Sequence, residues 1–439
     1  MIYVVLTGMA FSLFSPNLTY AQNSIDVSGA NGGAIRLGWS SSTCNSAIEG
    51  AIRYNSSVVG IEYCNGVTWT GATGGTTFTG VSKLDAGEIH DCLIKTDGTL
   101  WCWGTDGRGE LGLGSPDSIE EAPVQVGTET DWVDVTTGED NTCGIRDTAS
   151  NRTLWCWGSE NDGVLGNGVD NGNGEQQSPI QIGAAVNWNN VSCGGSWGFS
   201  GFCCATQTDN TLWCWGNDED GQTAQGAAGT DVLSPTQVGT DTNWDKVSVG
   251  HDHACAIRTN GTIWCWGENG DGPIGNNSTA DADVPTQENT SATDWQSVVA
   301  GGDTTCAIKT NNQLWCWGQG TDGSHGLGNT SDTLVPTQVG TDTDWSKVTH
   351  SSQRGKFGEW PSDVYAYHGC AIKTNNDLYC WGSNDLGQIG DGSTTDRYSP
   401  VLIGSGWEEV SAGAFKTCGV KSTNLYCWGY IPITIKLTP

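Results

Sequence analysis

The sequence has few cations, few methionines and no long apolar segment. Lys and Arg together number 18 against 49 Asp and Glu, so the formal net charge is -31 at pH 7. Nucleic acids and anionic membrane surfaces are recognised through clustered cations, and this deficit argues against electrostatic binding to either. No segment after the N-terminus approaches the ~20 apolar residues of a membrane-spanning helix. We therefore expect neither nucleic-acid binding nor membrane insertion.

The N-terminus carries a short apolar run over residues 4–14, which is too short to cross a bilayer. Thr19-Tyr20-Ala21 then offers a small-residue cleavage site before Gln22. This pattern is typical of a secretory signal peptide, although no Lys or Arg precedes the apolar run. We expect residues 1–21 to be a signal peptide and the mature protein to be secreted, periplasmic or held at the cell surface.

Glycine, tryptophan and cysteine are abundant instead, with 64, 22 and 18 residues. Between residues 92 and 428 one phrase recurs seven times: a cysteine, a short hairpin, a second cysteine and then Trp-Gly. A unit that recurs every ~50 residues is typical of propellers, solenoids and repeat arrays. Short aromatic strands and tight glycine turns suit this composition. The tryptophans of the seven Trp-Gly pairs are Trp103, Trp157, Trp215, Trp266, Trp317, Trp381 and Trp428.

Each repeat places its two cysteines on the two strands of one hairpin. In the first repeat a three-residue turn centred on Asp97 and Gly98 sets Cys92 opposite Cys102, near enough for a disulfide. Zinc is the alternative, but it needs closely spaced pairs whose four ligands converge, so we expect no metal here. An even cysteine count in an exported chain favours disulfides throughout. We expect nine: Cys44 with Cys64 and Cys193 with Cys203 outside the repeated hairpins, and Cys92 with Cys102, Cys143 with Cys156, Cys204 with Cys214, Cys255 with Cys265, Cys306 with Cys316, Cys370 with Cys380 and Cys418 with Cys427 within them.

The repeat divides into four short strands. In the fourth repeat we assign them to Pro235–Val238, Trp244–Val249 and the two arms of the hairpin Cys255–Gly267. Four strands per unit around a central channel is the propeller arrangement. The first repeat lacks the proline strand, and Tyr430–Ile435 resembles it. We therefore expect this C-terminal strand to pair into the first blade, so that deleting Tyr430–Pro439 opens the ring.

The segment Gly87–Pro123, with Trp103-Gly104 at its centre and the loop Gly109-Glu-Leu-Gly112, resembles the regulator-of-chromosome-condensation repeat of bacterial-type secreted propellers. The resemblance covers about residues 75–436 and implies an all-β fold, a seven-bladed β-propeller of four-stranded blades. We expect the propeller to span residues 73–439. A small disulfide-bracketed N-terminal hairpin module should precede it over residues 22–72. The matched positions are framework residues in the family, so the resemblance carries over no catalytic or binding residue.

Several local patterns look like functional motifs. Gly107–Gly112 matches a dinucleotide fingerprint by letter, and Gly194–Gly198 matches a nucleophile elbow. Both motifs work only where a strand turns into a helix, and no helical pattern follows either segment. We therefore interpret both as turns.

Histidines and acidic turns offer two further candidates. His90, His253 and His368 each precede a hairpin cysteine, and we interpret them as hydrogen-bonded within their blades; a metal shared by His251 and His253 is the alternative. The acidic turns at residues 170–175 and 218–221 carry oxygen ligands, but without the twelve-residue calcium spacing. We expect no cofactor, with Ca²⁺ at these turns as the alternative.

Two insertions supply the candidate binding site. Both join the Trp-x-x-Val strand to the hairpin, and strand alternation places both on the same propeller face. They add aromatic residues and two cations to an acidic surface, and such residues dominate interface hot spots. The alternative is that these loops cover the channel mouth and bury their own aromatics. The candidates are Trp197, Phe199 and Phe202 in the first insertion, and Arg354, Lys356, Phe357, Trp360, Tyr365 and Tyr367 in the second.

The sequence shows no constellation of acid, base or metal ligands, so we predict that the protein is not an enzyme. We expect a secreted or surface-exposed interaction or adhesion module that presents one propeller face to an unidentified protein or glycan. It would be a monomeric propeller, alone or within a larger surface assembly. A secreted inhibitor of an enzyme, resembling the propellers that inhibit β-lactamases, is the alternative. Export and the acidic surface argue against the nucleotide-exchange role that the resemblance also implies.

Overall fold

The computed structural model describes residues 78–430 except 116–117, 173, 197–199 and 352–366, together with the backbone of three earlier strands. The chain divides into two compact units, residues 1–78 and 79–439. In the first unit, β1 (Ile52–Asn55), β2 (Gly60–Cys64) and β3 (Trp69–Gly71) form one antiparallel sheet. The expected hairpin is thus a three-stranded meander, and the predicted bond between Cys44 and Cys64 lies outside the described residues.

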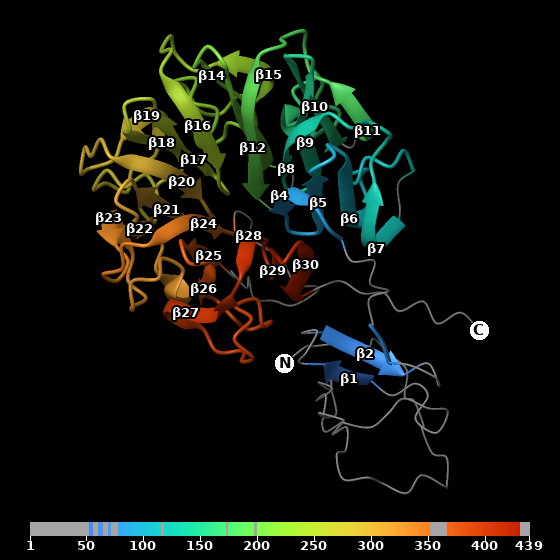
Figure 1. Cartoon of the computed structure of the whole chain (residues 1–439). Coiled ribbons are helices and arrows are strands. Elements are labelled where there is room, and N and C mark those ends of the chain that lie inside the picture. The colour runs from blue at the N-terminus through green and yellow to red at the C-terminus, as the bar shows by residue number, and fades with distance from the viewer. Residues whose placement is uncertain are drawn as a thin grey trace, which may run out of the picture. The chain divides into compact units, whose positions relative to one another are not determined.

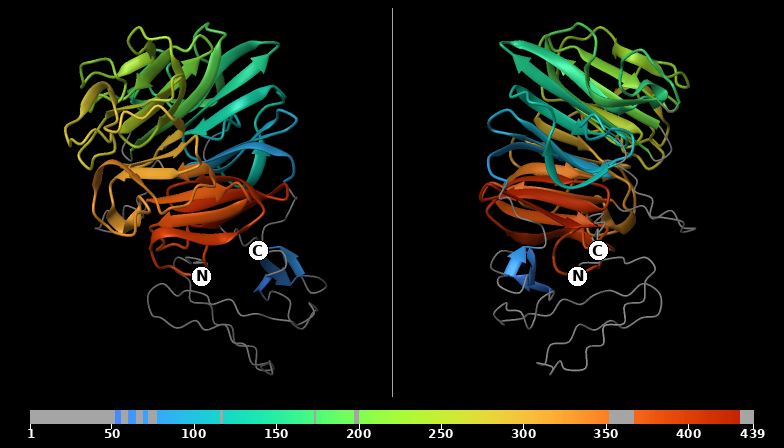
Figure 2. Two further views of the ribbon diagram at one scale, coloured as in Figure 1. Left: turned by 60° about the vertical axis from the view of Figure 1, so that its left-hand side comes forward. Right: turned by 90° about the vertical axis from the view of Figure 1, so that its right-hand side faces the viewer.

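The second unit is a ring of seven antiparallel sheets, each built from consecutive strands (Figure 1). Figure 2 shows the ring from two further directions. Six sheets have four strands, and the seventh has three within the described residues. The seven-bladed propeller is therefore confirmed. In chain order the blades are β4 (Val81–Ala86), β5 (His90–Lys95), β6 (Leu100–Asp106) and β7 (Ser118–Gln125); β8 (Trp132–Thr137), β9 (Asn141–Thr148), β10 (Asn151–Ser159) and β11 (Glu175–Gln181); β12 (Trp188–Ser196), β13 (Ser200–Gln207), β14 (Leu212–Gly216) and β15 (Val232–Gln237); β16 (Trp244–Val249), β17 (His253–Arg258), β18 (Ile263–Gly267) and β19 (Ala282–Gln287); β20 (Trp295–Ala300), β21 (Thr304–Lys309), β22 (Leu314–Gly318) and β23 (Thr333–Gln338); β24 (Trp345–His350), β25 (His368–Lys373), β26 (Asp377–Gly382) and β27 (Arg397–Ser405); and β28 (Trp407–Ala412), β29 (Lys416–Lys421) and β30 (Asn424–Gly429). Two short 3₁₀ turns, η1 (Asn161–Gly163) and η2 (Thr321–Gly323), lie between third and fourth strands.

The cysteine hairpins have the predicted register. Cys92 lies directly opposite Cys102, and the turn between their strands ends on Gly98, whose φ is 79°. A three-residue turn needs a left-handed residue at its third place, which glycine and asparagine adopt most readily. Four other hairpins end their turns on such a residue, always at positive φ: Asn210, Gly261, Asn312 and Asn376.

Eight of the nine predicted disulfides form, and the described residues contain no free cysteine. Fifteen of the sixteen bonded cysteines are buried, with at most 3% of their surface exposed, and Cys427 on β30 is half-buried. The disulfides are therefore largely part of the core, and their role is to fix the hairpins. The bonded pairs are Cys92 with Cys102, Cys143 with Cys156, Cys193 with Cys203, Cys204 with Cys214, Cys255 with Cys265, Cys306 with Cys316, Cys370 with Cys380 and Cys418 with Cys427.

The predicted division of the repeat into blades was wrong by one strand. The strand that contains Pro235 pairs with β14, so it is the outer strand of the third blade and not the first strand of the fourth. Proline cannot donate a ladder hydrogen bond, and it therefore suits an edge strand and discourages edge-to-edge association. The six outer strands each carry one: Pro123, Pro179, Pro235, Pro285, Pro336 and Pro400.

The predicted closure of the ring also fails as stated. The first blade is complete with its own strands β4 to β7, so it has no place for a C-terminal strand. The ring closes instead by side contact between β28 and β4. The Ala86 amide donates to Ser411 Oγ at 3.0 Å, and the buried Lys416 ammonium lies 2.9 Å from the Asp91 carboxylate. Residues 431–439 lie outside the described residues.

The core lies between blades, around the tryptophans of the Trp-Gly pairs. Trp266 has no exposed surface, and its indole N–H donates to the Gln222 carbonyl of the preceding blade at 2.8 Å. The same bond joins each later blade to the one before it, so each of these tryptophans holds two blades together. The donors and acceptors are Trp157 to Glu110, Trp215 to Val164, Trp266 to Gln222, Trp317 to Pro273, Trp381 to Ser324 and Trp428 to Gln388.

Candidate binding face

Connections between first and second strands and between third and fourth strands emerge at the same face, because neighbouring strands in each blade are antiparallel. We call this the loop face. The connections between first and second strands have three residues in six blades, and the sixth blade has a longer one: they are residues 87–89, 138–140, 197–199, 250–252, 301–303, 351–367 and 413–415. The long loops of this face are residues 107–117, 160–174, 217–231, 268–281, 319–332 and 383–396. Both predicted insertions join a first strand to a second strand. The extra residues of Cys193–Cys203 lengthen β12 and β13 and leave the usual three-residue connection, whereas residues 351–367 make the connection between β24 and β25 much longer than its counterparts.

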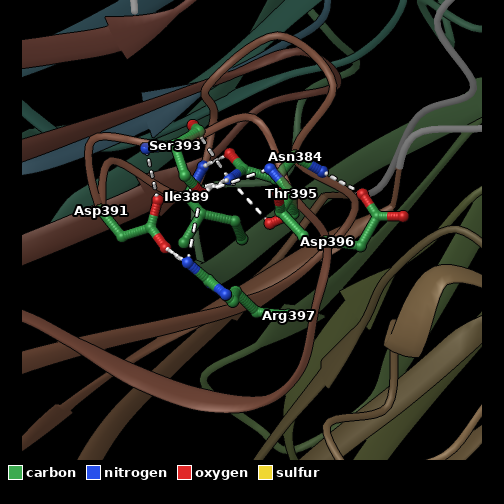
Figure 3. Close-up of polar contacts among 7 residues, drawn as sticks. All are labelled: Asn384, Ile389, Asp391, Ser393, Thr395, Asp396 and Arg397. Carbon is green, nitrogen blue, oxygen red and sulfur yellow. Dashed lines mark hydrogen bonds and ion pairs between the residues drawn. The ribbon is translucent and has the colours of Figure 1, made fainter.

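The long loops are held by their own polar side chains. In the sixth blade the Asn384 amide donates to the carbonyls of Ser393 at 3.1 Å and Thr395 at 3.0 Å (Figure 3). Its side-chain oxygen accepts a hydrogen bond from the Ile389 backbone N–H at 3.0 Å. The Asp396 carboxylate accepts one from the Asn384 backbone N–H at 2.9 Å. Asn269 makes the same contacts in the fourth blade, to Ser278, Ala280 and Ile274. These loops are thus rigid scaffolds whose polar groups are largely used internally.

The acidic turns that were considered for Ca²⁺ divide into two kinds. Asp218 is part of the scaffold, because its Oδ1 accepts the Thr223 amide at 2.8 Å. Asp170 lies beside Asp162 and Asp231, with carboxylate oxygens of the three within 4.8 Å of one another. Burial and the neighbouring carboxylates raise the pKa of Asp162 to about 6. Three carboxylates can supply up to six of the six to eight oxygen ligands that Ca²⁺ takes, so Ca²⁺ beside Asp170 stays the alternative. The sequence spacing gave no sign of this trio, because it joins two blades.

Two of the predicted binding residues are buried and leave the candidate set. Phe202 has no exposed surface and packs in the core between the third and fourth blades. Tyr367 is 2% exposed, and its hydroxyl donates to Asp303 at 3.2 Å. Neither side chain can meet a partner. The other candidates lie outside the described residues: Trp197, Phe199, Arg354, Lys356, Phe357, Trp360 and Tyr365.

The recurring histidines join blades, whereas the sequence had suggested bonds within one blade. Thr142 Oγ1 donates to the Glu110 carbonyl at 2.8 Å, so it accepts the Nε2 hydrogen of His90 at 2.7 Å. His253 and Thr305 repeat the arrangement, as do His368 and Thr417. Burial lowers the pKa of His90 and His368 to about 3 and that of His253 to about 4. These imidazoles are therefore neutral structural donors at physiological pH.

A small cavity lies between the second and third blades, at one of the junctions where this arrangement is absent. Asn141 stands where the first, fourth and sixth blades have histidine, and Cys203 stands where the second, fifth and seventh blades have threonine. The shorter Asn141 side chain leaves space that an imidazole fills elsewhere. The side-chain amide of Asn161 faces this space, and neither its nitrogen nor its oxygen has a hydrogen-bond partner among the described residues. Sequence comparison of the repeats could have identified both exchanges. The cavity is lined by Glu139, Asp140, Asn141, Ser159, Asn161, Val164 and Gly201.

Many of the described cations are held away from the loop face. In six blades a Lys or Arg near the far end of the second strand lies over a tryptophan ring, as Arg258 does 4.0 Å from the centre of Trp264. Asp241 pairs with the same guanidinium at 2.6 Å. The carboxylates of the loop face therefore keep their negative charge largely uncompensated. The cations in this layer are Lys95, Arg146, Arg258, Lys309, Lys373 and Lys421.

Glu110 carries the most strongly raised carboxyl pKa on the loop face, and this predicts a measurable pH effect. Burial raises its pKa to about 8. Gln222 and Gln388 hold the same place in other blades, and all three side chains accept a backbone amide two residues earlier. A folded pKa above the unfolded value means that wild-type stability falls as pH rises from about 4.5 to about 8.

Replacing Glu110 by Gln should remove this loss, because the amide keeps the hydrogen bond without a charge. The variant should melt above the wild type at pH 7, and the gap should widen with pH by up to about 1.4 kcal/mol per unit. Thermal melts between pH 4.5 and 9 measure it, with the exposed Glu121→Gln as control. Parallel curves for wild type and Glu110→Gln would contradict the assignment.

The comparisons with known proteins agree with this architecture. Two models of the "Regulator of chromosome condensation (RCC1) repeat" match residues 97–145, 209–257 and 260–308, and residues 244–272, 295–324 and 363–388. The ultraviolet-B receptor UVR8 of Arabidopsis thaliana is 25% identical over 79% of this chain and 76% of its own length. The human E3 ubiquitin-protein ligase HERC2 is 26% identical over 74% of this chain, which spans 6% of that protein.

Solved structures show the same fold. Human WBSCR16 superposes with a TM-score of 0.63 at 18% identity, over 81% of this chain and 88% of its own. Prp20p of Saccharomyces cerevisiae, described with its binding to Gsp1p and histones, superposes with a TM-score of 0.63 at 16% identity, over 81% of this chain and 83% of its own. None of the helices within the described residues has the length and apolar character needed to cross a membrane.

Proposed function

We propose that this chain, a propeller built from RCC1 repeats, is an exported, non-enzymatic interaction or adhesion module that binds a protein or glycan through its loop face. The observation that carries the proposal is the construction of that face. Rigid loops such as the one around Asn384 frame it, and residues 351–367 form a connection of 17 residues between β24 and β25 where the other blades have three. Variable segments on a rigid scaffold are the usual site of recognition.

Two further observations support an extracellular binding role. Eight disulfides among the described residues suit an oxidising compartment. RCC1-type relatives include proteins whose described partners are other proteins, such as the yeast RCC1 solved with Kap60. A secreted enzyme inhibitor would use the same face. The separate first unit with its own sheet favours a module within a larger assembly over a free-standing inhibitor.

The test is capture of a partner by wild type and by a loop variant. Replacing Arg354, Phe357 and Trp360 together with Ala should abolish capture from the native extracellular milieu, because aromatic residues and Arg supply most hot-spot energy. The melting temperature should change little. Lys246→Ala removes an exposed cation from β16 and serves as the matched control. Retained capture with a collapsed melting temperature would show that the insertion is a structural plug.

A further inference from the structure

The seventh blade has an open edge within the described residues. In six blades the third strand pairs with an outer strand that carries a proline, as Cys156 on β10 pairs with Ile180 on β11. The third strand of the seventh blade, β30, pairs only with β29 among the described strands. An unpaired edge presents a row of backbone donors and acceptors to another strand.

The side chains of β30 are more exposed than their counterparts in the other blades. The aliphatic residue two places before the second hairpin cysteine is fully buried in the other six blades: Leu100, Leu154, Leu212, Ile263, Leu314 and Leu378 each have 0% exposure. The equivalent Leu425 is only half-buried. Trp428 is half-buried as well, whereas its six counterparts are at most 7% exposed. The seventh blade is thus apolar where a fourth strand lies in the others.

The chain contains one more segment with the outer-strand pattern. Pro432-Ile-Thr-Ile435 repeats Pro179-Ile-Gln-Ile182 of the second blade; the former lies outside the described residues. Its position in the chain differs, however. Residues 383–399 separate the Trp-Gly pair from Pro400 in the sixth blade, whereas only Tyr430 and Ile431 separate Gly429 from Pro432.

A return of this segment along its own β30 conflicts with turn chemistry. Pairing Cys427 with Ile433, as Cys156 pairs with Ile180, leaves a three-residue turn of Gly429, Tyr430 and Ile431. The five three-residue hairpin turns of this chain end on glycine or asparagine at positive φ. Here the third residue would be Ile431, whose β-branch disfavours that conformation. Gly429 at the first place already has a φ of 101°, whereas a right-handed first residue is required.

We propose that the edge of β30 accepts residues 432–435 of a second copy of this chain, in a reciprocal exchange. If β30 continues straight through Tyr430, two copies pair antiparallel about a two-fold axis at Tyr430. Cys427 of each then lies opposite Ile433 of the other, which is the register of the complete blades. Each copy fills the blade that the other leaves incomplete, in a closed isologous dimer. This inference does not depend on the proposed function.

The mass in solution tests the exchange. Light scattering after gel filtration should give twice the chain mass for the wild type. Replacing Ile433 and Ile435 with Lys should give a monomer whose propeller still folds, because both residues follow the last described strand. A wild-type monomer would overturn the proposal, and so would a variant that remains dimeric. A monomeric wild type whose melting temperature falls in the Lys variant would show that the segment closes its own blade.

A cysteine trap tests the axis. Tyr430→Cys should form a disulfide-linked dimer on non-reducing gels, because the two copies of residue 430 face each other across the axis. Asn424→Cys, on the same strand, is the matched control: its two copies lie ~40 Å apart along the strands and should not crosslink. Equal crosslinking of the two variants, or none in Tyr430→Cys, would overturn the register.

Discussion

Replacing Lys416 by Met should lower the free energy of unfolding at pH 7 by about 3–5 kcal/mol, the usual effect of removing one partner from a buried ion pair. The side chains of Lys416 and Asp91 are 4% and 3% exposed, and 2.9 Å separates the ammonium from the carboxylate. The pair lies where the seventh blade meets the first, so it joins the two ends of the ring. Methionine keeps the length of the lysine side chain, and the loss therefore reports the missing charge rather than a cavity.

The loss should depend on pH in a direction that identifies Asp91. Burial raises the pKa of Asp91 to about 6, although the Lys416 ammonium lowers it. Without Lys416 this pKa rises further, and the folded state then holds the proton more tightly than the unfolded state does. The difference between variant and wild type should therefore be smaller near pH 4, where Asp91 is protonated in both, and should grow by up to about 1.4 kcal/mol toward pH 7.

Two controls separate the buried charge from other effects. Lys421→Met removes a cation from the same blade that lies 5.6 Å from the centre of the Trp407 ring; its loss should stay within about 1 kcal/mol, as for exposed cation–π contacts. Combining Lys416→Met with Asp91→Asn should recover much of the stability at pH 7. Equal losses at pH 4 and pH 7, or no recovery in the double variant, would contradict the role of the pair.

Features that depend on local sequence could be predicted from it. The opposition of Cys92 and Cys102 follows from a turn of three residues whose third member is Gly98, and the same logic gives the other hairpins. The repeat period then gives seven blades, because each unit must bury its apolar face against the next. Spacing within one hairpin is sufficient for all of this.

Features that depend on the neighbouring blade could not be derived in the same way. Nothing within one repeat says that Thr142, which lies in the next blade, accepts the His90 hydrogen bond. Nor does it say that Asp231 approaches Asp162. Spacing along the chain is the same whether a strand ends one blade or begins the next, so the division of the repeat was misjudged.

Some missed features did leave a signal in the sequence. Pro235 marks an edge strand, because proline cannot take part in a ladder on both sides, and this indicates the correct division into blades. Phe202 stands two residues before Cys204, the place that His90 and His253 hold before their cysteines. All three are buried. Aligning the repeats position by position, and not judging the insertion by its aromatic content, would have removed Phe202 from the binding candidates.

The other large effect concerns the tryptophans that join blades. Replacing Trp317 by Ala should lower the free energy of unfolding by about 3–5 kcal/mol, the range for a fully buried large aromatic residue. Trp317 has no exposed surface, and its indole N–H donates to the Pro273 carbonyl of the preceding blade at 2.7 Å. Gly275 of that blade packs so closely on the ring that an added Cβ would lie 2.5 Å from the indole nitrogen. The two blades are therefore fitted to this one side chain.

Two variants distinguish packing from the hydrogen bond. Trp315→Ala, two residues earlier on β22, removes a half-buried tryptophan and should cost clearly less than Trp317→Ala. Trp317→Phe keeps most of the packing and loses the N–H. The Pro273 carbonyl still accepts Thr305 Oγ1 at 2.8 Å, so this variant should lose only about 1–2 kcal/mol. Chemical denaturation measures all three. Equal losses for Trp315→Ala and Trp317→Ala would mean that the blades are held by their strands alone. A Trp317→Phe variant as unstable as Trp317→Ala would assign the stability to the indole hydrogen bond.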